Sequence, residues 1–519
     1  MNSLAIALLS LCMGGAVEGA ALPMASVFVA GPMLDDVKDM DLEQLEKELY
    51  SKDEARRRAV VRQCVVLNTT ASWKLVVEAL GNDKGRPADE AQLQLAHLSD
   101  EKVLKLLWGR DGLNSKDVLI RTRVAELIGR REMGVDAEFL GKQLNDKEPE
   151  VRRLILWSLE RLANGKHLLG DVQRELQKPL YKMALGDRDG AVRGAALLAY
   201  GAIATPEEAM ALARKMAKDK LPGALCGVAR IAPLLAEQDP EGALELLRLS
   251  ALSLESSVRS AAIDGIEALG TKDGVALLVE RLEVEVRPRI RWRIVDALQL
   301  LSGMKYRLDV RPWQKWQEGL DSDWTPALRR NEKRKSDRGE ATVAFAGLPI
   351  LSDRVCFLID LSGSIWNKED DGTVPKDIVG GELQKAIDHL TEDTLFNVIP
   401  YINDPVPWMD ELQKANGKNR EAAKAFFTDC RARGAGNVYD AIQLALSDPE
   451  VDTIIVLTDG APSGGQRWNM ELMVDLLVEQ NRFRGVTYDA LLVGASGFLT
   501  GFWEELASST GGECTSIEL

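Results

Sequence analysis

The pattern of hydrophobic and polar positions divides the chain into two regions with different periodicities. From residue 41 to residue 303, apolar residues recur at helical spacing, and one sequence motif is repeated along the chain. In this motif a turn is followed by an apolar residue and an arginine, and then by an apolar run. The clearest copies of the motif contain Arg152, Arg193, Arg259 and Arg291. The recurrence predicts an all-α solenoid of stacked helical hairpins.

Each recurring polar residue has an expected role in the hairpins. An aspartate in the turn, such as Asp146 or Asp187, is expected to cap the helix that follows. The arginine is expected to bridge to an acidic neighbour. Such a stack offers a groove that serves either as a spacer or as a protein-binding surface, and the pattern leaves both alternatives open.

After residue 340 the pattern changes to alternating strands and helices. Val355 to Ile359 is a continuous apolar run typical of a central buried strand. Further strands are expected at 396–402, 453–457, 488–493 and 514–517, with helices at 383–390, 420–430, 438–446, 470–478 and 502–507. This alternation predicts an α/β, doubly wound, Rossmann-like domain over 340–519, so the whole chain is multidomain.

Two further segments flank these regions. Residues 304–339 contain Trp313 and Trp316 one helical turn apart, which predicts a helix capping the last repeat, and then a basic run, 329–338, that indicates a solvated linker. Residues 1–21 have the apolar run and small residues of a signal peptide. They predict an extracytoplasmic protein of bacterial type in the periplasm, in the cell envelope or secreted, with an uncleaved N-terminal anchor as the alternative.

Composition narrows the classes of function. The chain has 519 residues and a net charge of -15, which argues against nucleic acid as a partner because phosphates are bound mainly by clustered Lys and Arg. Beyond the N-terminal signal, no segment is apolar enough for an integral membrane span. There is no Walker loop, GxSxG, CxxC or HExxH motif, so we do not expect an enzyme.

Oxygen-bearing side chains follow two of the expected strands. Asp360, Ser362 and Ser364 come directly after the first strand, and Asp459 follows the strand at 453–457. Parallel strands bring their carboxyl ends to one edge of a sheet, so these side chains are expected to meet there. Oxygen ligands suit a hard cation such as Mg²⁺, for which Mn²⁺ or Ca²⁺ can substitute.

This combination resembles a known family of binding domains. Asp360-Leu361-Ser362-Gly363-Ser364 together with Thr458-Asp459-Gly460 resembles the metal-ion-dependent adhesion site, or MIDAS, of von Willebrand factor A (VWA) domains, and the repeats of 41–303 resemble HEAT repeats. The resemblance implies that Ser362 and Ser364 contact the metal and that Asp360 and Asp459 act directly or through water. It also implies a protein partner that presents an Asp or Glu to the open metal position.

One position departs from the family pattern. Gly436 stands where these domains usually have a threonine whose hydroxyl binds the metal. A water or the amide of Asn437 would then have to substitute, although Asn437 is expected mainly to cap its helix, and Asp440 can orient a water. The alternative hypothesis is therefore an interaction scaffold that binds without metal and carries a degenerate MIDAS.

Overall fold

The chain is described here by a computed structural model, which forms two compact units. The first unit comprises residues 1–186 and 198–204, and the second comprises residues 187–197 and 205–519. The predicted signal peptide and the basic run 329–338 lie outside the described residues. The structure describes residues 37–82, 85–96, 98, 100–131, 134–327, 344–366, 374–431, 433–493 and 497–517.

The first unit is helical in its described part, apart from a short parallel pair of strands, β1 (Val135–Asp136) and β2 (Leu168–Leu169). Aspartates cap several of the helices, as Asp53 does for α3 and Asp117 for α7. The helices are α2 (Leu42–Glu48), α3 (Glu54–Leu67), α4 (Thr70–Ala79), α5 (Arg86–Ala96), α6 (Glu101–Trp108), α7 (Val118–Ile128), α8 (Ala137–Gln143), α9 (Pro149–Asn164), the π-helical turn η3 (Gln173–Gln177) and α10 (Lys178–Gly186).

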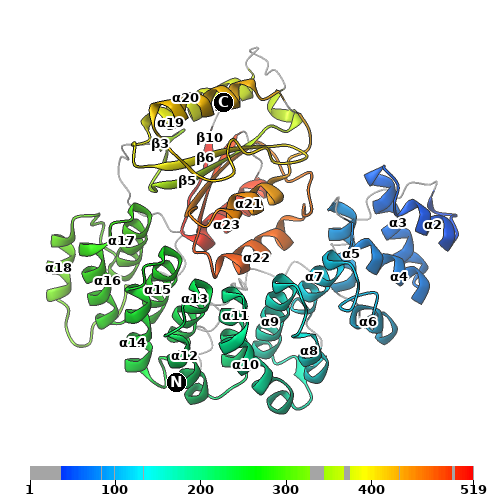
Figure 1. Ribbon diagram of the computed structural model, residues 1–519, viewed down its shortest axis with the longest axis horizontal. Coiled ribbons are helices and arrows are strands. Elements are labelled where there is room, and N and C mark those ends of the chain that lie inside the picture. Colours follow the sequence, from blue (N-terminus) through cyan, green and yellow to red (C-terminus); the bar gives the residue numbers. More distant parts are fainter. Residues whose placement is uncertain are drawn as a thin grey trace. The chain divides into compact units, whose positions relative to one another are not determined.

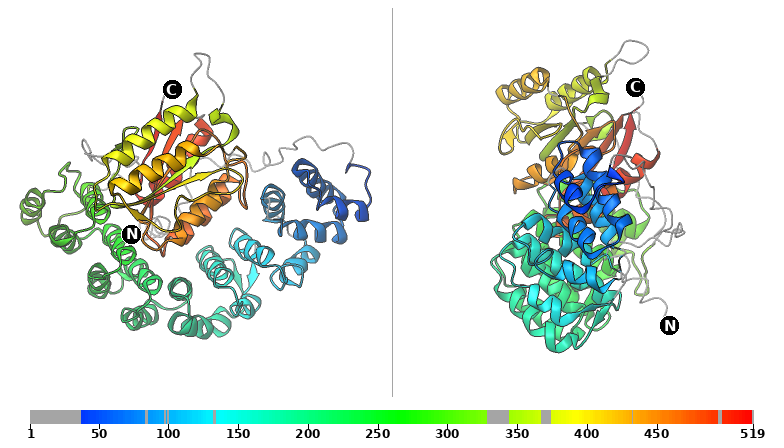
Figure 2. Two further views of the ribbon diagram at one scale, coloured as in Figure 1. Left: turned by 45° about the horizontal axis from the view of Figure 1, so that its top comes forward. Right: turned by 90° about the vertical axis from the view of Figure 1, so that its right-hand side faces the viewer.

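The second unit contains helices followed by the large sheet. Within it, α13 packs against α15 and α15 packs against α17, while α14 and α16 pack beside them; Figure 2 shows these helices in green. Their bounds are α12 (Pro206–Met216), α13 (Pro222–Ile231), the 3-10 turn η4 (Ala232–Leu235), α14 (Pro240–Ala251), α15 (Ser256–Leu269), α16 (Lys272–Val284), α17 (Pro288–Ser302) and α18 (Val310–Glu318). Helix α11 (Gly190–Gly201) is shared by both units.

Three of the arginines at this place in the repeat, Arg121, Arg193 and Arg259, make the same two contacts. In the first unit, Arg121 donates to the carbonyl of Ser115, six residues earlier, at 2.9 Å and forms an ion pair with Asp146 at 2.8 Å. In the second unit, Arg259 donates to the carbonyl of Ser253 at 3.0 Å and pairs with Glu285 at 2.8 Å. The expected bridge to an acidic neighbour is therefore confirmed for these three arginines.

The expected capping role of Asp146 is wrong. Its carboxylate accepts hydrogen bonds from Arg121 and from the backbone N–H of Glu148, and the residue at the start of α9, Glu148, makes no side-chain cap. The physical reason is that Asp146 lies two residues before the N-cap, Glu148, so its carboxylate binds the N–H of Glu148 and not an N–H of the helix. In the copy of the motif that contains Asp187, it is Asp189 and not Asp187 that accepts the N–H of Val192 in the helix.

The predicted helix at Trp313 and Trp316 is present as α18. Trp313 is fully buried, its ring meets those of Tyr306 and Trp316 edge to face, and α18 packs against α16. The apolar face of this helix therefore covers the hairpin before it.

The sheet domain has six strands in the order β10-β9-β8-β5-β6-β7, all parallel to their neighbours except β7. Helices α19 and α20 cover one face, and α21, α22 and α23 lie on the other (Figure 1). The strands are β5 (Arg354–Asp360), β6 (Leu395–Tyr401), β7 (Gln413–Lys414), β8 (Thr453–Thr458), β9 (Thr487–Val493) and β10 (Cys514–Ile517); the helices are α19 (Pro375–His389), α20 (Gly417–Asp429), α21 (Val438–Ser447), α22 (Met470–Asn481) and α23 (Gly497–Thr510). All five expected strands are confirmed.

The amino-terminal edge of this sheet rests on the helices of its own unit. Arg230 on α13 donates to the carbonyl of Arg482 at 2.7 Å, and Arg293 on α17 donates to the carbonyl of Thr510 at 3.3 Å while it binds Asp264. Arg482 and Thr510 precede strands β9 and β10, so these contacts leave the carboxyl edge of the sheet at the opposite end. Among the described residues, no helix is both long and apolar enough to cross a membrane.

Candidate metal centre

Asp360 is the last residue of the central strand β5, and only 3% of its surface is exposed. Its two carboxylate oxygens are held from two sides: Oδ1 accepts the backbone N–H of Ser362 and Oδ2 accepts the hydroxyl of Thr458, each at 2.8 Å. Burial raises the pKa of Asp360 to about 6, and the charge of Asp459 adds to the rise, although both hydrogen bonds lower it. A carboxylate in such surroundings is stabilised by a cation.

Asp459 follows β8 directly, and β8 is the neighbour of β5 in the sheet. Its Oδ1 atom is buried and has no hydrogen-bond partner in the described part of the chain. A buried acceptor of this kind carries a substantial desolvation cost unless a donor, a water or a metal satisfies it. The hydroxyl of Tyr401, at the end of β6, is also buried, and burial and then the charge of Asp360 raise its pKa well above the usual value.

The serines lie on the loop after β5. Ser362 is 9% exposed and forms an isolated parallel bridge with Gly434. Ser364 lies in the 3-10 turn η5 (Gly363–Trp366), and its side chain falls outside the described residues. The structure thus brings Asp360, Ser362 and Asp459 to one sheet edge, with the backbone of Ser364 beside them.

The loop before α21 closes over this edge. A Cβ placed on Gly436 would lie 3.4 Å from Oδ2 of Asp360, so a threonine at this position would face the carboxylate. Asn437 caps α21 as expected: its Oδ1 accepts the N–H of Asp440 at 3.2 Å, and its Nδ2 donates to the carbonyl of Asn403 and the carboxylate of Asp440, each at 2.8 Å. Both amide hydrogens of Asn437 are therefore engaged within the loop.

Sequence reasoning missed two residues that shape this loop. Asn403, two residues beyond β6, accepts the N–H of Ala435 at 2.9 Å. Ser463 accepts the N–H of Gly436 at 2.8 Å on its hydroxyl and donates its own N–H to the carbonyl of Gly436 at 3.0 Å. The position of Asn403 after a strand end was a usable signal, whereas nothing in the sequence distinguishes Ser463 from other loop serines.

Two cationic side chains lie against Trp366, at the end of the turn η5. The guanidinium of Arg433 lies 4.6 Å from the ring centroid of Trp366, and the ammonium of Lys376 lies 5.2 Å from the same ring. Burial lowers the pKa of Lys376, as does the charge of Arg431. Arg433 is exposed, directly before Gly434, so it can meet an acidic group that approaches this edge.

The side chains present fit a hard divalent cation. Two carboxylates and serine hydroxyls are oxygen donors, and one carboxylate oxygen is buried without a partner. No cluster of three or more His, Cys, Asp or Glu side chains suited to a metal occurs in the described ranges. A metal at this edge would therefore depend on hydroxyls and waters as well as on Asp360 and Asp459.

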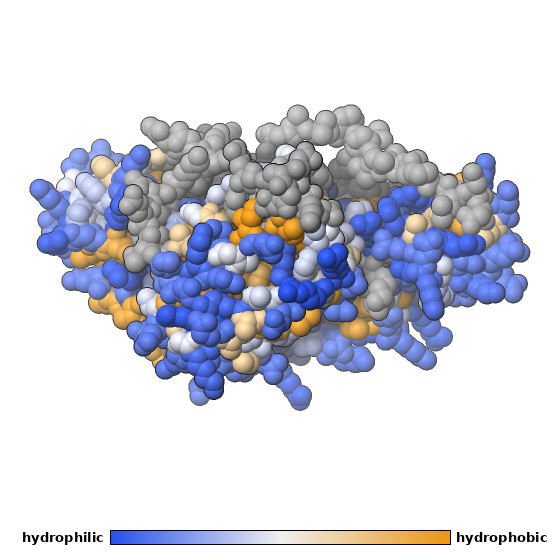
Figure 3. All heavy atoms as spheres, turned by 90° about the horizontal axis from the view of Figure 1, so that it is seen from above, coloured by the Kyte–Doolittle hydropathy of each residue, from blue (hydrophilic) through white to orange (hydrophobic). Residues whose placement is uncertain are grey.

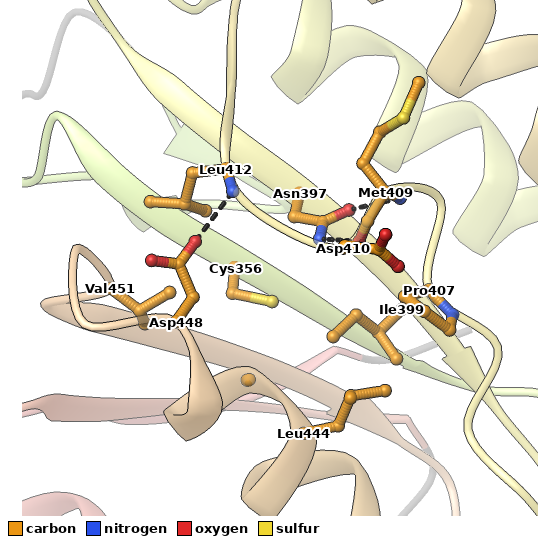
Figure 4. Close-up of a pocket in the computed structure, with 11 residues that line it drawn as sticks. Cys356, Asn397, Ile399, Pro407, Met409, Asp410, Leu412, Leu444, Asp448 and Val451 are labelled. Atoms are coloured by element: carbon orange, nitrogen blue, oxygen red, sulfur yellow. Dashed lines mark hydrogen bonds between the residues drawn. The ribbon is translucent and has the colours of Figure 1, made fainter.

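A separate pocket near the amino-terminal half of β5 is lined by Cys356, Asn397, Met409, Leu412 and Asp448, among others (Figure 4). It encloses about 10 Å³, the lower limit for one water molecule. Its polar groups bind one another: Asn397 exchanges hydrogen bonds with the backbone of Met409, and Asp448 accepts the N–H of Leu412 at 2.7 Å. These hydrogen bonds hold the segment after β6 in place, and the pocket is too small for a ligand.

No family model matches the chain. The inter-alpha-trypsin inhibitor heavy chain H3 of Bos taurus is 33% identical over 132 residues, which cover 23% of this chain and 14% of that protein. The von Willebrand factor A domain-containing protein 3B of Homo sapiens is 26% identical over 163 residues, which cover 31% of this chain and 12% of that protein. A solved von Willebrand factor type A structure from Catenulispora acidiphila is 20% identical, with a TM-score of 0.27, and the match covers 33% of this chain and 40% of that chain.

The matched part is a small fraction of the length of these curated relatives, so their other domains have no counterpart in the alignment. The six-stranded sheet with helices on both faces is the part of the described structure that has an α/β fold. The chain therefore contains a domain homologous to the von Willebrand factor A domains.

Proposed function

We propose that this chain is a binding protein rather than an enzyme, and that its sheet domain binds an acidic group of a protein partner through Mg²⁺ held in a MIDAS-like site. The observation that carries this proposal is the pair of carboxylates at one sheet edge, with Asp360 buried and Oδ1 of Asp459 buried without a partner. Proteins with VWA domains are related to this chain, and such domains commonly mediate protein–protein interaction.

Asp360, Ser362, Ser364 and Asp459 would hold the metal, and Mn²⁺ or Ca²⁺ can substitute for Mg²⁺. The ion would supply an open coordination position for an Asp or Glu of the partner. Because the chain carries a net charge of -15, a bound cation reverses the potential locally, and exposed Arg433 adds to that effect. Among the residues that Figure 3 colours, hydrophilic ones predominate around a smaller hydrophobic group.

The proposal also covers the helices before the sheet domain. We assign them to HEAT-like repeats that form either a scaffold or a second binding surface. We also propose that the protein acts outside the cytoplasm, in the periplasm, in the cell envelope or as a secreted protein, because of the signal-like residues 1–21.

Partner capture tests the metal dependence. The full chain, Asp360→Ala and the control Asp393→Ala are immobilised and exposed to an envelope extract of the parent organism, once with Mg²⁺ and once with chelator. Asp393 is exposed and lies before β6, at the other edge of the sheet. We expect partners that are retained by the wild type and the control only with Mg²⁺, and are lost from Asp360→Ala.

The alternative is a metal-independent scaffold, and Gly436 is the observation that favours it, because the family's threonine hydroxyl is missing. Partners retained equally with chelator and by Asp360→Ala would support this alternative and contradict the metal-dependent proposal.

A further inference from the structure

We infer that the hydroxyl of Ser463 takes the place of the missing threonine hydroxyl and is a metal ligand of this site. The inference rests on the proposed metal-dependent function and names a ligand that the family pattern does not supply. The loop after β8 contains Ser463, and the loop before α21 contains Gly436.

Reciprocal backbone contacts join the two loops at this point. The Ser463 hydroxyl accepts the N–H of Gly436 at 2.8 Å, and the N–H of Ser463 donates to the carbonyl of Gly436 at 3.0 Å. A Cβ on Gly436 would lie 3.6 Å from the Ser463 hydroxyl oxygen and 3.4 and 3.6 Å from the two oxygens of Asp360. The Ser463 hydroxyl and the Asp360 carboxylate therefore flank the space that a threonine side chain would enter.

Two glycines allow this close approach of the loops. Gly465 has φ +83°, and a Cβ there would fall 1.8 Å from Oδ1 of Asn437. A Cβ on Gly464 would lie 3.0 Å from the Cβ of Ala435. Glycine at both positions lets the loop after β8 dock on the loop before α21, which brings the Ser463 hydroxyl to the edge that holds Asp360.

The chemistry of the Ser463 hydroxyl suits a ligand. A hydroxyl oxygen has two acceptor positions and one proton, and the N–H of Gly436 uses one acceptor position. The second position is available to a hard cation. The alternative ligand atom, Oδ1 of Asn437, already accepts the N–H of Asp440 at 3.2 Å, and Nδ2 donates to the Asn403 carbonyl and the Asp440 carboxylate.

Gly436 itself does not require glycine. Its φ lies outside the left-handed region, and a Cβ there would make ordinary contacts. A threonine can therefore be placed at this position, where it would offer a hydroxyl beside Ser463. This makes Gly436→Thr a rescue variant for loss of the Ser463 hydroxyl.

The test measures Mn²⁺ and Mg²⁺ affinity of the full chain by calorimetry. Ser463→Ala is expected to weaken metal binding about tenfold or more. Gly436→Thr in the Ser463→Ala background is expected to restore most of the lost affinity, and to add much less in the wild type, because the two hydroxyls serve the same position.

The variant Ser463→Cys shows whether residue 463 binds the metal directly or only supports the loop. A sulfur ligand weakens Mg²⁺ binding and favours the softer Cd²⁺, so the ratio of Cd²⁺ to Mg²⁺ affinity should rise. The matched control is Ser447→Cys on exposed Ser447 at the end of α21, which should leave the ratio unchanged. Circular dichroism spectra of all variants establish that they are folded.

The outcomes distinguish this inference from the proposed function. If the wild type binds metal and Asp360→Ala does not, but Ser463→Ala and Ser463→Cys match the wild type, the Ser463 inference is overturned and the proposed function stands. If the wild type binds neither Mn²⁺ nor Mg²⁺, the proposed function fails and the ligand role fails with it.

Discussion

The residues at the carboxyl edge of the sheet have two roles: some present charged oxygens, and others hold the loop that lies over them. Asp360 and Asp459 present carboxylate oxygens at the ends of β5 and β8, and the burial of Asp360 and of the Oδ1 atom of Asp459 makes an uncompensated charge costly. Asn437 and Asn403 present none, but their amides fix the loop that closes over the site. A substitution in the second group should therefore change stability and loop geometry, whereas one in the first group should change metal affinity.

Asn437→Ala tests the supporting group. The variant loses the cap of α21 and the donor to the Asn403 carbonyl, so we expect the free energy of unfolding to fall by roughly 1–3 kcal/mol. The matched control is Asn416→Ala, which removes the cap of α20 from an exposed residue and should cost about 1 kcal/mol or less. Urea denaturation of both variants measures the difference, and equal losses would contradict the role given to Asn437.

Asp452 gives a prediction for the dependence of stability on pH. Burial raises its pKa to about 6 from an ordinary value of 3.8, although hydrogen bonding to Ser352 and the charge of Arg287 lower it. The folded state therefore binds this proton more tightly than the unfolded state. The resulting stabilisation is fully present below pH 3.8 and is lost as the pH rises through about 6.

Asp452→Asn removes this titration and keeps an oxygen that can accept from Ser352. At pH 7.5 the variant should be more stable than the wild type by up to about 3 kcal/mol, from a shift of about two pKa units. The advantage should shrink when unfolding is measured at pH 5. An advantage that is the same at both pH values would show that the Asp452 carboxyl does not titrate in this range.

At the scale of residues, the sequence predicted which side chains meet at the sheet edge, but not the contacts between the loops. Asp360, Ser362 and Asp459 follow directly from their places at strand ends, because parallel strands share an edge. Ser463 could not be predicted, since its position depends on Gly464 and Gly465 allowing two loops, distant in the sequence, to meet.

At the scale of elements, continuous apolar runs located the strands. Val355 to Ile359 is buried on both faces of the sheet, and such a run has no competing helical interpretation of the same length. The two-residue strand β7 and the hairpin of β3 (Ala344–Phe345) and β4 (Leu348–Pro349) are too short to show alternation, so they were not expected. Helix α19 begins at Pro375, earlier than the expected 383, because a proline at the first helical position fits without losing a hydrogen bond.

The repeated arginine joins successive helices, and Arg259 is its most buried example in the second unit. It binds Glu285 through two nitrogens and also donates to the carbonyls of Ser253 and Leu254. Arg259→Ala leaves Glu285 buried without this partner, so we expect a loss of about 3–5 kcal/mol in unfolding free energy.

Arg248→Ala is the matched control for Arg259→Ala. Arg248 pairs with Glu280 at 3.2 Å, but both side chains are about half exposed, so its loss should cost at most about 1 kcal/mol. Thermal and denaturant unfolding of the full chain compare the two variants. A loss in Arg259→Ala as small as that in Arg248→Ala would contradict the structural role of the repeated arginine.

At the scale of the whole molecule, the second unit combines helices and sheet through the amino-terminal edge of the sheet. Arg230 and Arg293 bind carbonyls of the loops before β9 and β10, which lie opposite the edge that carries Asp360. The sequence could not predict that Arg230 and Arg293 contact the amino-terminal edge of the sheet, because both arginines bind main-chain carbonyls. The arrangement suits a protein that is anchored at one sheet edge and binds at the other.

Metal titration of the full chain tests the central claim most directly. Isothermal calorimetry with Mn²⁺ and Mg²⁺ compares the wild type with Asp360→Ala and with the control Asp393→Ala. The account predicts that the wild type and the control bind one metal ion per chain, and that Asp360→Ala binds none. A wild type that binds neither ion, or an Asp360→Ala variant that binds as the wild type does, would contradict it.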